Sequence, residues 1–169
     1  MAEVGFYHLT RSSLDEALPP LLEKATSQGL RLVLVARDSE HLDHLDRWLW
    51  AFRPDSFLPH GTAATGFAAK QPIYLAPNVA NPNGATVLVT VDGLLPDADA
   101  PFERVVDLFD GQDAAAVAAA RERWISWRER GAKLVYWQQR PEGGWIKARE
   151  EAGKGREAQG KGREGVGKG

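Results

Sequence analysis

The chain has 169 residues, of which 43% are hydrophobic and 26% charged, with a formal net charge of −2 and no cysteine. This composition is typical of one globular domain, and it excludes disulfides, a thiolate nucleophile and cysteine-based metal sites. No apolar run approaches the roughly 20 residues of a membrane span, and residues 1–5 lack the basic and apolar segments of a signal peptide, so we expect a cytoplasmic protein without membrane contact.

The hydrophobic pattern predicts alternating strands and helices along residues 1–148. Ser13 and Glu16 have the spacing of a capping box at the start of a helix, and Gly131 is suited to end the last helix. The nearly continuous apolar run at 30–36 is typical of a central strand that is covered on both faces. The predicted strands cover residues 5–9, 30–36, 73–76, 85–91, 105–109, 134–138 and 145–147, and the predicted helices cover 13–29, 40–52 and 113–130. We therefore expect a single α/β domain with a mostly parallel, partly mixed central sheet flanked by helices.

Residues 149–169 differ in composition from the rest of the chain. They consist almost entirely of Gly, Glu, Lys, Arg, Ala and Gln, and Val166 is the only larger apolar residue. Such a segment buries too little apolar surface to offset the entropy lost on ordering. We therefore expect a folded domain over residues 1–148 and a disordered tail over 149–169.

Charge is distributed unevenly along the chain. Residues 1–111 contain eight basic and fifteen acidic side chains, whereas residues 112–148 contain seven basic and four acidic ones. An acidic body repels a phosphate backbone, so we expect weak or no direct binding to nucleic acid. The basic strip near the carboxyl end is suited to a compact acidic partner.

The glycines at Gly61 and Gly66 have the spacing of the first two glycines in a phosphate-binding loop. Phe67 and Ala68 stand where that loop requires Lys and Ser or Thr, and a loop rather than a strand comes before the segment. We interpret it as a surface loop and expect no nucleotide cofactor.

The four histidines do not form a recognisable catalytic or metal-binding pattern. His41 and His44 lie on the polar face of a predicted helix, where solvation explains them better than a metal ion. His8 and His60 have no Ser, Asp or Glu at a known catalytic spacing, and the hydrolase and dehydrogenase motifs are absent. We therefore expect no catalytic residues, no metal and no cofactor.

The predicted helix at 113–130 carries two arginines in its apolar half. At about 100° per residue, Arg121 and Arg128 fall close to Val117 and Trp124 and bracket the tryptophan along the chain, while Arg123 falls on the opposite, polar arc. The arginines either extend to solvent from the edge of the core or form a shallow groove. In a groove they would donate to carboxylates while Trp124 and Val117 receive an apolar side chain.

Trp50 and Phe57 form a second candidate surface. Trp50 lies well away from the leucine stripe of the helix at 40–52, and Phe57 follows in a loop that contains prolines. Partly exposed aromatic residues on a rigid support are typical interface anchors. The alternative is that both rings fold back onto the sheet.

Five short segments together resemble the chi subunit of bacterial DNA polymerase III, and the resemblance covers most of residues 4–137. They are Phe6-Tyr7-His8-Leu9, Leu45-Asp46 with Leu49-Trp50, Ser56-Phe57-Leu58-Pro59-His60, Val105-Val106-Asp107 and Ala120-Arg121-Glu122-Arg123-Trp124. The resemblance implies a fold like a mononucleotide-binding domain without a nucleotide site. It also implies a non-catalytic accessory subunit of the clamp-loader complex, which links the replicase to single-stranded DNA-binding protein by binding the acidic, Phe-terminated carboxyl tail of that protein.

The resemblance places the tail-binding arginine on Arg121, the neighbouring aromatic position on Trp124 and a further basic position on Arg128. Val117 stands where better-known members have a lysine one turn before the arginine, which shifts more of the electrostatic contact to Arg128. The last part of the chain, from about residue 138, has no clear counterpart in the family.

The resemblance also implies a second partner, the small psi subunit or alternatively a helicase, facing Trp50 and Phe57. Two other classes of function remain open from the residues alone. The alternation of strands and helices is compatible with a nucleotide- or nucleic-acid-binding module, and a small enzyme would have to use His8 or His60.

Overall fold

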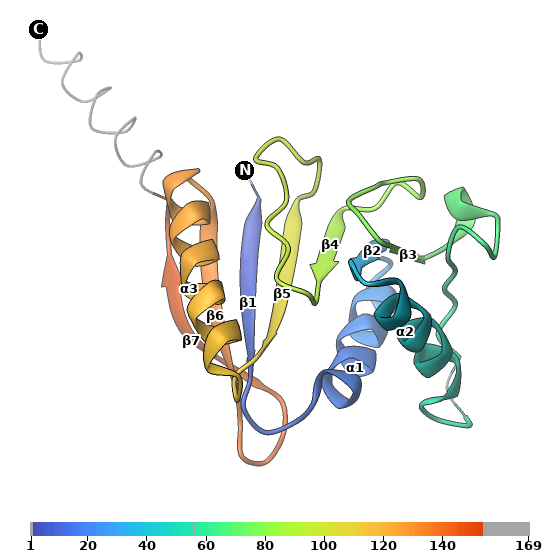
Figure 1. Ribbon diagram of the computed structural model, residues 1–169, viewed down its shortest axis with the longest axis horizontal. Helices are drawn as coiled ribbons and strands as arrows, with labels where there is room; N and C mark the ends of the chain where they lie inside the picture. The colour runs from blue at the N-terminus through green and yellow to red at the C-terminus, as the bar shows by residue number, and fades with distance from the viewer. Residues whose placement is uncertain (1, 56, 154–169) are drawn as a thin grey trace, which may run out of the picture.

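A seven-stranded sheet with the order β3-β2-β4-β5-β1-β6-β7 forms the centre of the computed structural model, which describes residues 2–55 and 57–153 (Figure 1). The strands are β1 (Glu3–Leu9), β2 (Leu32–Val35), β3 (Ile73–Ala76), β4 (Val87–Thr90), β5 (Arg104–Asp110), β6 (Lys133–Gln139) and β7 (Trp145–Glu151). All neighbouring strands pair in parallel except β6 and β7, which form an antiparallel hairpin. The predicted α/β fold with a mostly parallel, mixed sheet is confirmed.

The helices α1 (Leu14–Ser27), α2 (Ser39–Ala51) and α3 (Ala114–Glu129) connect the parallel strands, and a short 3-10 turn, η1 (Ala68–Lys70), precedes β3. The predicted capping box is present at α1, where the Ser13 hydroxyl accepts from the Glu16 backbone N–H. Asp38 and Asp113 cap α2 and α3 in the same way, with side-chain oxygens that accept from first-turn N–H groups. Each cap satisfies donors that a helix start would otherwise leave unpaired.

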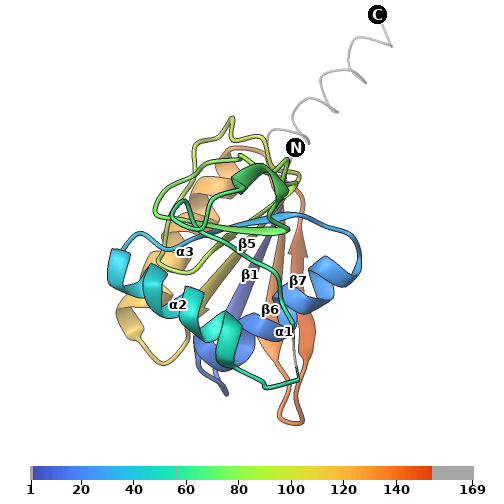
Figure 2. The same ribbon diagram turned by 90° about the vertical axis from the view of Figure 1, so that its right-hand side faces the viewer.

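The helices cover opposite faces of the sheet, so the domain has two hydrophobic cores. Figure 2 shows α1 and α3 on either side of the strands. On β2, Leu32 and Leu34 belong to the core under α1 and α2, whereas Val33 and Val35 belong to the core under α3. This alternation explains the continuous apolar run of the strand, because both of its faces are buried.

The loop after β1 is closed by a side chain from the end of β6. The backbone N–H groups of Thr10, Arg11 and Ser12 all donate to Oε1 of Gln139, over 2.9, 2.8 and 3.2 Å, and the Gln139 amide donates to the Ser12 hydroxyl over 2.6 Å. In open α/β sheets this edge, outside the carboxyl ends of the parallel strands, is where ligands bind. Here the chain's own amide uses those donors and ties the hairpin to the start of α1.

Strand β7 is longer than predicted. Glu151, Glu150 and Arg149 pair with Leu134, Val135 and Tyr136 of β6, so the domain boundary predicted at residue 148 falls within the strand. Backbone pairing with β6 holds these residues even though their side chains are polar. The remainder of the predicted tail, 154–169, lies outside the described residues.

Within residues 2–55 and 57–153, no helix combines the length and the hydropathy that a bilayer crossing requires.

Candidate functional site

A groove of about 640 Å³ lies between α3 and the β6–β7 hairpin. All four residues predicted from the helix pattern line it, namely Val117, Arg121, Trp124 and Arg128. Aromatic side chains from the sheet form its floor: Phe6, Phe109 and Tyr136. The Trp124 ring meets Phe6 edge to face at 5.3 Å and Tyr136 at 6.5 Å between centroids, which fixes the indole at the centre of the groove.

The position of α3 explains why these side chains face the groove. Ala120 and Trp127 are buried against the sheet and anchor the helix, while Val117 and Trp124 are half-buried beside them. Arg121 follows the buried Ala120 in the chain and is exposed. The groove wall is therefore the margin of the buried stripe, where an apolar surface and charged groups meet.

The two predicted arginines, Arg121 and Arg128, differ in the contacts that they make within the protein. No hydrogen bond or ion pair joins Arg121 to another of the described residues. Arg128 is 28% exposed at its side chain, its Nη1 lies 3.6 Å from Oε1 of Glu151, and its buried Nε has no hydrogen-bond partner among the described residues. The Arg121 guanidinium and the exposed part of the Arg128 guanidinium therefore have donors available to a carboxylate.

A third arginine, Arg149, was not predicted for this site. It lies on β7, and its guanidinium carbon stands 5.7 Å from the centroid of the Trp124 ring, within the range of a cation–π contact. The low-complexity composition from residue 149 onward had placed it in a disordered tail. A register shift in the hairpin sets Arg149 opposite Tyr136 and Lys147 opposite Trp137, which breaks the side-chain alternation of the strand, so the sequence pattern carried no signal for the position of Arg149.

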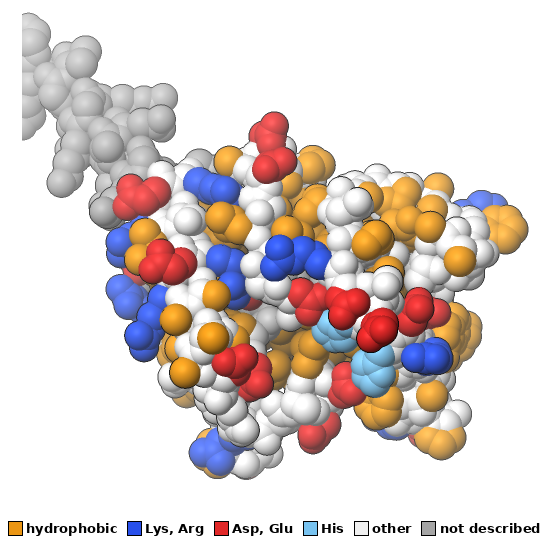
Figure 3. Space-filling model, viewed as in Figure 1, with side chains coloured by type: hydrophobic (Ala, Val, Ile, Leu, Met, Phe, Trp, Pro, Cys, Tyr) orange, Lys and Arg blue, Asp and Glu red, His pale blue; other side chains and the backbone are white. Residues whose placement is uncertain are grey.

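Figure 3 shows basic side chains gathered along the edge of the molecule formed by α3 and the hairpin.

The part of the groove lined by His8, Phe109 and Tyr136 carries no such positive charge. There, the His8 ring stacks on Phe109 at 4.8 Å and its Nδ1 shares a hydrogen bond with the Tyr136 hydroxyl. Burial lowers the pKa of His8 below its usual value, so the ring is neutral near pH 7. The positive charge of the groove therefore comes from its arginines.

The predicted position of Arg123 on the polar arc of the helix is wrong. Arg123 is buried and donates to Asp107 of β5 through Nε (2.7 Å) and Nη2 (3.0 Å). Burial raises the pKa of Asp107, and the Arg123 guanidinium opposes that rise. The helix pattern could not show this, because the inward-facing carboxylate lies on a strand distant in sequence. The pair joins two of the segments that carried the family resemblance.

The second candidate surface is also present. Trp50 and Phe57 are 49% and 78% exposed, so the alternative in which both fold back onto the sheet is wrong. Their ring centroids lie 6.2 Å apart, and Trp50 also packs at 4.1 Å on His60. His60 is buried, and its two ring nitrogens lie 2.7 Å from the Leu58 carbonyl and 3.0 Å from the Asp46 carbonyl. Trp50 therefore packs on a buried, hydrogen-bonded side chain, and the exposed Phe57 ring packs on Trp50.

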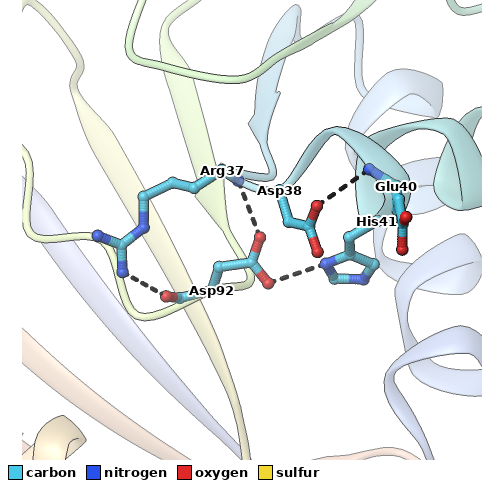
Figure 4. Close-up of polar contacts among 5 residues, drawn as sticks. All are labelled: Arg37, Asp38, Glu40, His41 and Asp92. Carbon is cyan, nitrogen blue, oxygen red and sulfur yellow. Dashed lines mark hydrogen bonds and ion pairs between the residues drawn. The ribbon is translucent and has the colours of Figure 1, made fainter.

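The helical histidines connect elements of the fold. Figure 4 shows Asp92 between His41 Nδ1, at 2.8 Å, and the backbone N–H of Arg37, at 2.9 Å, while the Arg37 guanidinium donates to the Asp92 carbonyl over 2.6 Å. His44 Nε2 lies 2.7 Å from Asp15 of α1. No group of three or more His, Cys, Asp or Glu in the part of the chain that the structure describes is placed to hold a metal ion.

Comparison with known proteins relates the chain to one family. The family described as "DNA polymerase III chi subunit, HolC" matches residues 1–135. A protein of Pseudomonas aeruginosa named DNA polymerase III subunit chi is 30% identical over 139 residues, which cover 79% of this chain and 94% of the relative. Its counterpart in Escherichia coli K12 is 26% identical over 73% of this chain and 84% of the relative.

A probable subunit chi of Rickettsia prowazekii is 32% identical over 91 residues, and that match spans 54% of this chain and 55% of the relative. The family match includes α3 and all four predicted groove residues, and it ends before Arg149. The chain belongs to the DNA polymerase III chi subunit family.

Proposed function

We propose that this chain is a non-catalytic accessory subunit of a bacterial DNA polymerase III clamp-loader complex in the cytoplasm. In this proposal the groove beside α3 binds the acidic carboxyl-terminal tail of single-stranded DNA-binding protein and so links that protein to the replicase. The observation that carries the proposal is the open groove in which Arg121, Arg128 and Arg149 surround Trp124. Membership in the chi family supports it.

The chemistry of the groove matches such a tail. Carboxylates of the tail would accept from Arg121, which has no partner among the described residues, and from the exposed part of the Arg128 guanidinium. Trp124 and Val117 would receive the apolar side chain at the chain end. Each charge-assisted hydrogen bond of this kind contributes about 1.5–3 kcal/mol, and added salt weakens partly exposed pairs.

The titration of a synthetic peptide tests this proposal directly. The peptide carries several aspartates and ends in phenylalanine with a free carboxylate. We expect Arg121→Ala to bind it about ten- to a hundredfold more weakly than the wild type, which is the loss of one such contact. Arg140→Ala is the matched control, because Arg140 is an exposed arginine of the hairpin turn outside the groove. Equal affinities of Arg121→Ala and wild type would remove Arg121 from the site, and no binding to the wild type would refute the proposed function.

Trp50 and Phe57 are proposed to face the second partner, a psi subunit or a helicase. Both are large and exposed, and Trp50 packs on the buried His60, which suits an interface anchor. The two surfaces belong to helices on opposite faces of the sheet. Substitution of either aromatic residue should therefore leave peptide binding in the groove unchanged.

A nucleotide- or nucleic-acid-binding module is the alternative function. The Gln139 side chain occupies the backbone donors of the loop after β1, and the acidic excess of residues 1–111 disfavours a phosphate backbone. We expect little binding to bare single-stranded DNA in a mobility-shift assay. Tight binding that weakens steeply with salt would favour the alternative.

A further inference from the structure

One acidic side chain already contacts the basic wall of the groove. Glu151, near the end of β7, places Oε1 3.6 Å from Nη1 of Arg128 and Oε2 2.9 Å from Nη2 of Arg149. Arg149 is the cation that stands over the Trp124 ring. Glu151 is not itself a lining residue, but its carboxylate contacts two of the three arginines that line the groove.

These contacts hold Glu151 by charge more than by hydrogen bonding. Its Oε2 is buried and has no aligned hydrogen-bond partner among the described residues, despite the short distance to Arg149. The longer contact to Arg128 exceeds hydrogen-bond distance, and Nε of Arg128 stays unpaired beside it. An incoming carboxylate that aligns with either guanidinium gains hydrogen bonds that Glu151 does not make.

We propose that Glu151 is an intramolecular competitor for the carboxylates of the acidic peptide that this groove binds. The proposal rests on the proposed function of the groove. In the free protein the single negative charge of Glu151 offsets part of the positive charge of Arg128 and Arg149 and keeps the Arg149 guanidinium over Trp124. Peptide carboxylates then displace Glu151, so that the measured affinity is the net of two competing sets of ion pairs.

Charge sets the expected size of this competition. Partly exposed ion pairs contribute a few tenths to about 1 kcal/mol, which corresponds to about a two- to fivefold change in affinity. Glu151→Gln keeps the size of the side chain and removes its charge. We therefore expect this variant to bind the aspartate-rich peptide about two- to fivefold more tightly than the wild type at low ionic strength, with the gain shrinking as salt is added.

Glu150→Gln is the matched control, because it removes the same charge from the adjacent residue of the same strand. Glu150 pairs with Lys133 and Lys147, neither of which lines the groove, whereas both arginines that Glu151 contacts line it. A general increase in positive charge would tighten both variants equally, whereas competition tightens only Glu151→Gln. A second peptide, with asparagine in place of every aspartate and an amidated end, should show no gain with either variant.

The outcomes separate the inference from the proposed function. Unchanged or weaker binding by a folded Glu151→Gln variant, with the wild type still binding, would overturn the competition and leave the proposed function in place. Failure of the peptide to bind wild type and both variants would overturn the proposed function, and the competition with it. If Glu151→Gln does not fold, the side-chain carboxyl carbon of Glu151 can be followed by NMR in the wild type. Its signal should shift in step with binding of the aspartate peptide, and an unmoved signal at saturation would overturn the proposal.

Discussion

Removal of the buried Arg123 side chain should destabilise the domain strongly. The pair with Asp107 is nearly enclosed, with side-chain exposures of 7% for Arg123 and 2% for Asp107, and it contains two hydrogen bonds. Arg123→Met leaves the carboxylate buried without a partner, which costs about 3–5 kcal/mol. Urea denaturation of the variant and the wild type at pH 7 measures this loss.

The same substitution gives a pH dependence with a defined sign. Burial raises the pKa of Asp107, and Arg123 is the group that opposes the rise, so its loss raises the pKa of the folded state further above the value in the unfolded chain. A carboxyl with a raised pKa in the folded state costs stability once the pH exceeds its lower pKa in the unfolded chain, and the cost reaches its full value above the raised pKa. The deficit of Arg123→Met should therefore be largest near pH 7 and become smaller as the pH falls below the raised pKa of the folded state toward the pKa of Asp107 in the unfolded chain.

A double variant tests whether the unpaired charge is the cause. Arg123→Met with Asp107→Leu replaces the pair by apolar groups, and we expect it to recover most of the lost stability. A loss below about 1 kcal/mol in Arg123→Met, or a double variant as unstable as the single one, would refute this account of the pair.

The remaining predictions concern the other contacts described above. Gln139→Ala leaves three backbone N–H groups without their acceptor, and we expect thermal or urea unfolding to show a loss of about 1–3 kcal/mol; an unchanged stability would show that water replaces the amide. Ser13→Ala removes the capping oxygen of α1 and should cost about 1 kcal/mol in the same assay, whereas no loss would mean that the cap is not used. Trp50→Ala and Phe57→Ala should abolish co-purification of the second partner without lowering the melting temperature appreciably, because both rings are exposed; retained partner with either variant would exclude this surface.

Much of the fold follows from local patterns in the sequence. The apolar run at 30–36 predicts a strand covered on both faces, and both faces of β2 are buried in the structure. The start of α1 is predicted by its capping box. The groove residues of α3 could also be predicted, since the margin of an apolar helical stripe lies at the edge of the core. These features depend on residues close together in the chain.

The errors arose where partners come from distant segments. The burial of Arg123 depends on Asp107, which the helix pattern of α3 does not include. Arg149 and Glu151 were assigned to the tail because their segment has little apolar character, yet backbone pairing with β6 carries β7 to Glu151. The sequence pattern therefore did not show that Arg149 lines the groove or that Glu151 contacts two of its arginines.

The indole N–H signals of the six tryptophans offer the most direct test of the groove as the binding site for an acidic chain end. Trp124 lies at the centre of the groove, whereas Trp50 lies on the second surface and the Trp48 N–H is bonded to the Asp15 carbonyl. In a titration of labelled protein with the aspartate-rich, Phe-terminated peptide, the Trp124 signal should shift strongly while those of Trp48 and Trp50 stay in place. An unmoved Trp124 signal at saturating peptide, or a dominant shift at Trp50, would contradict the account.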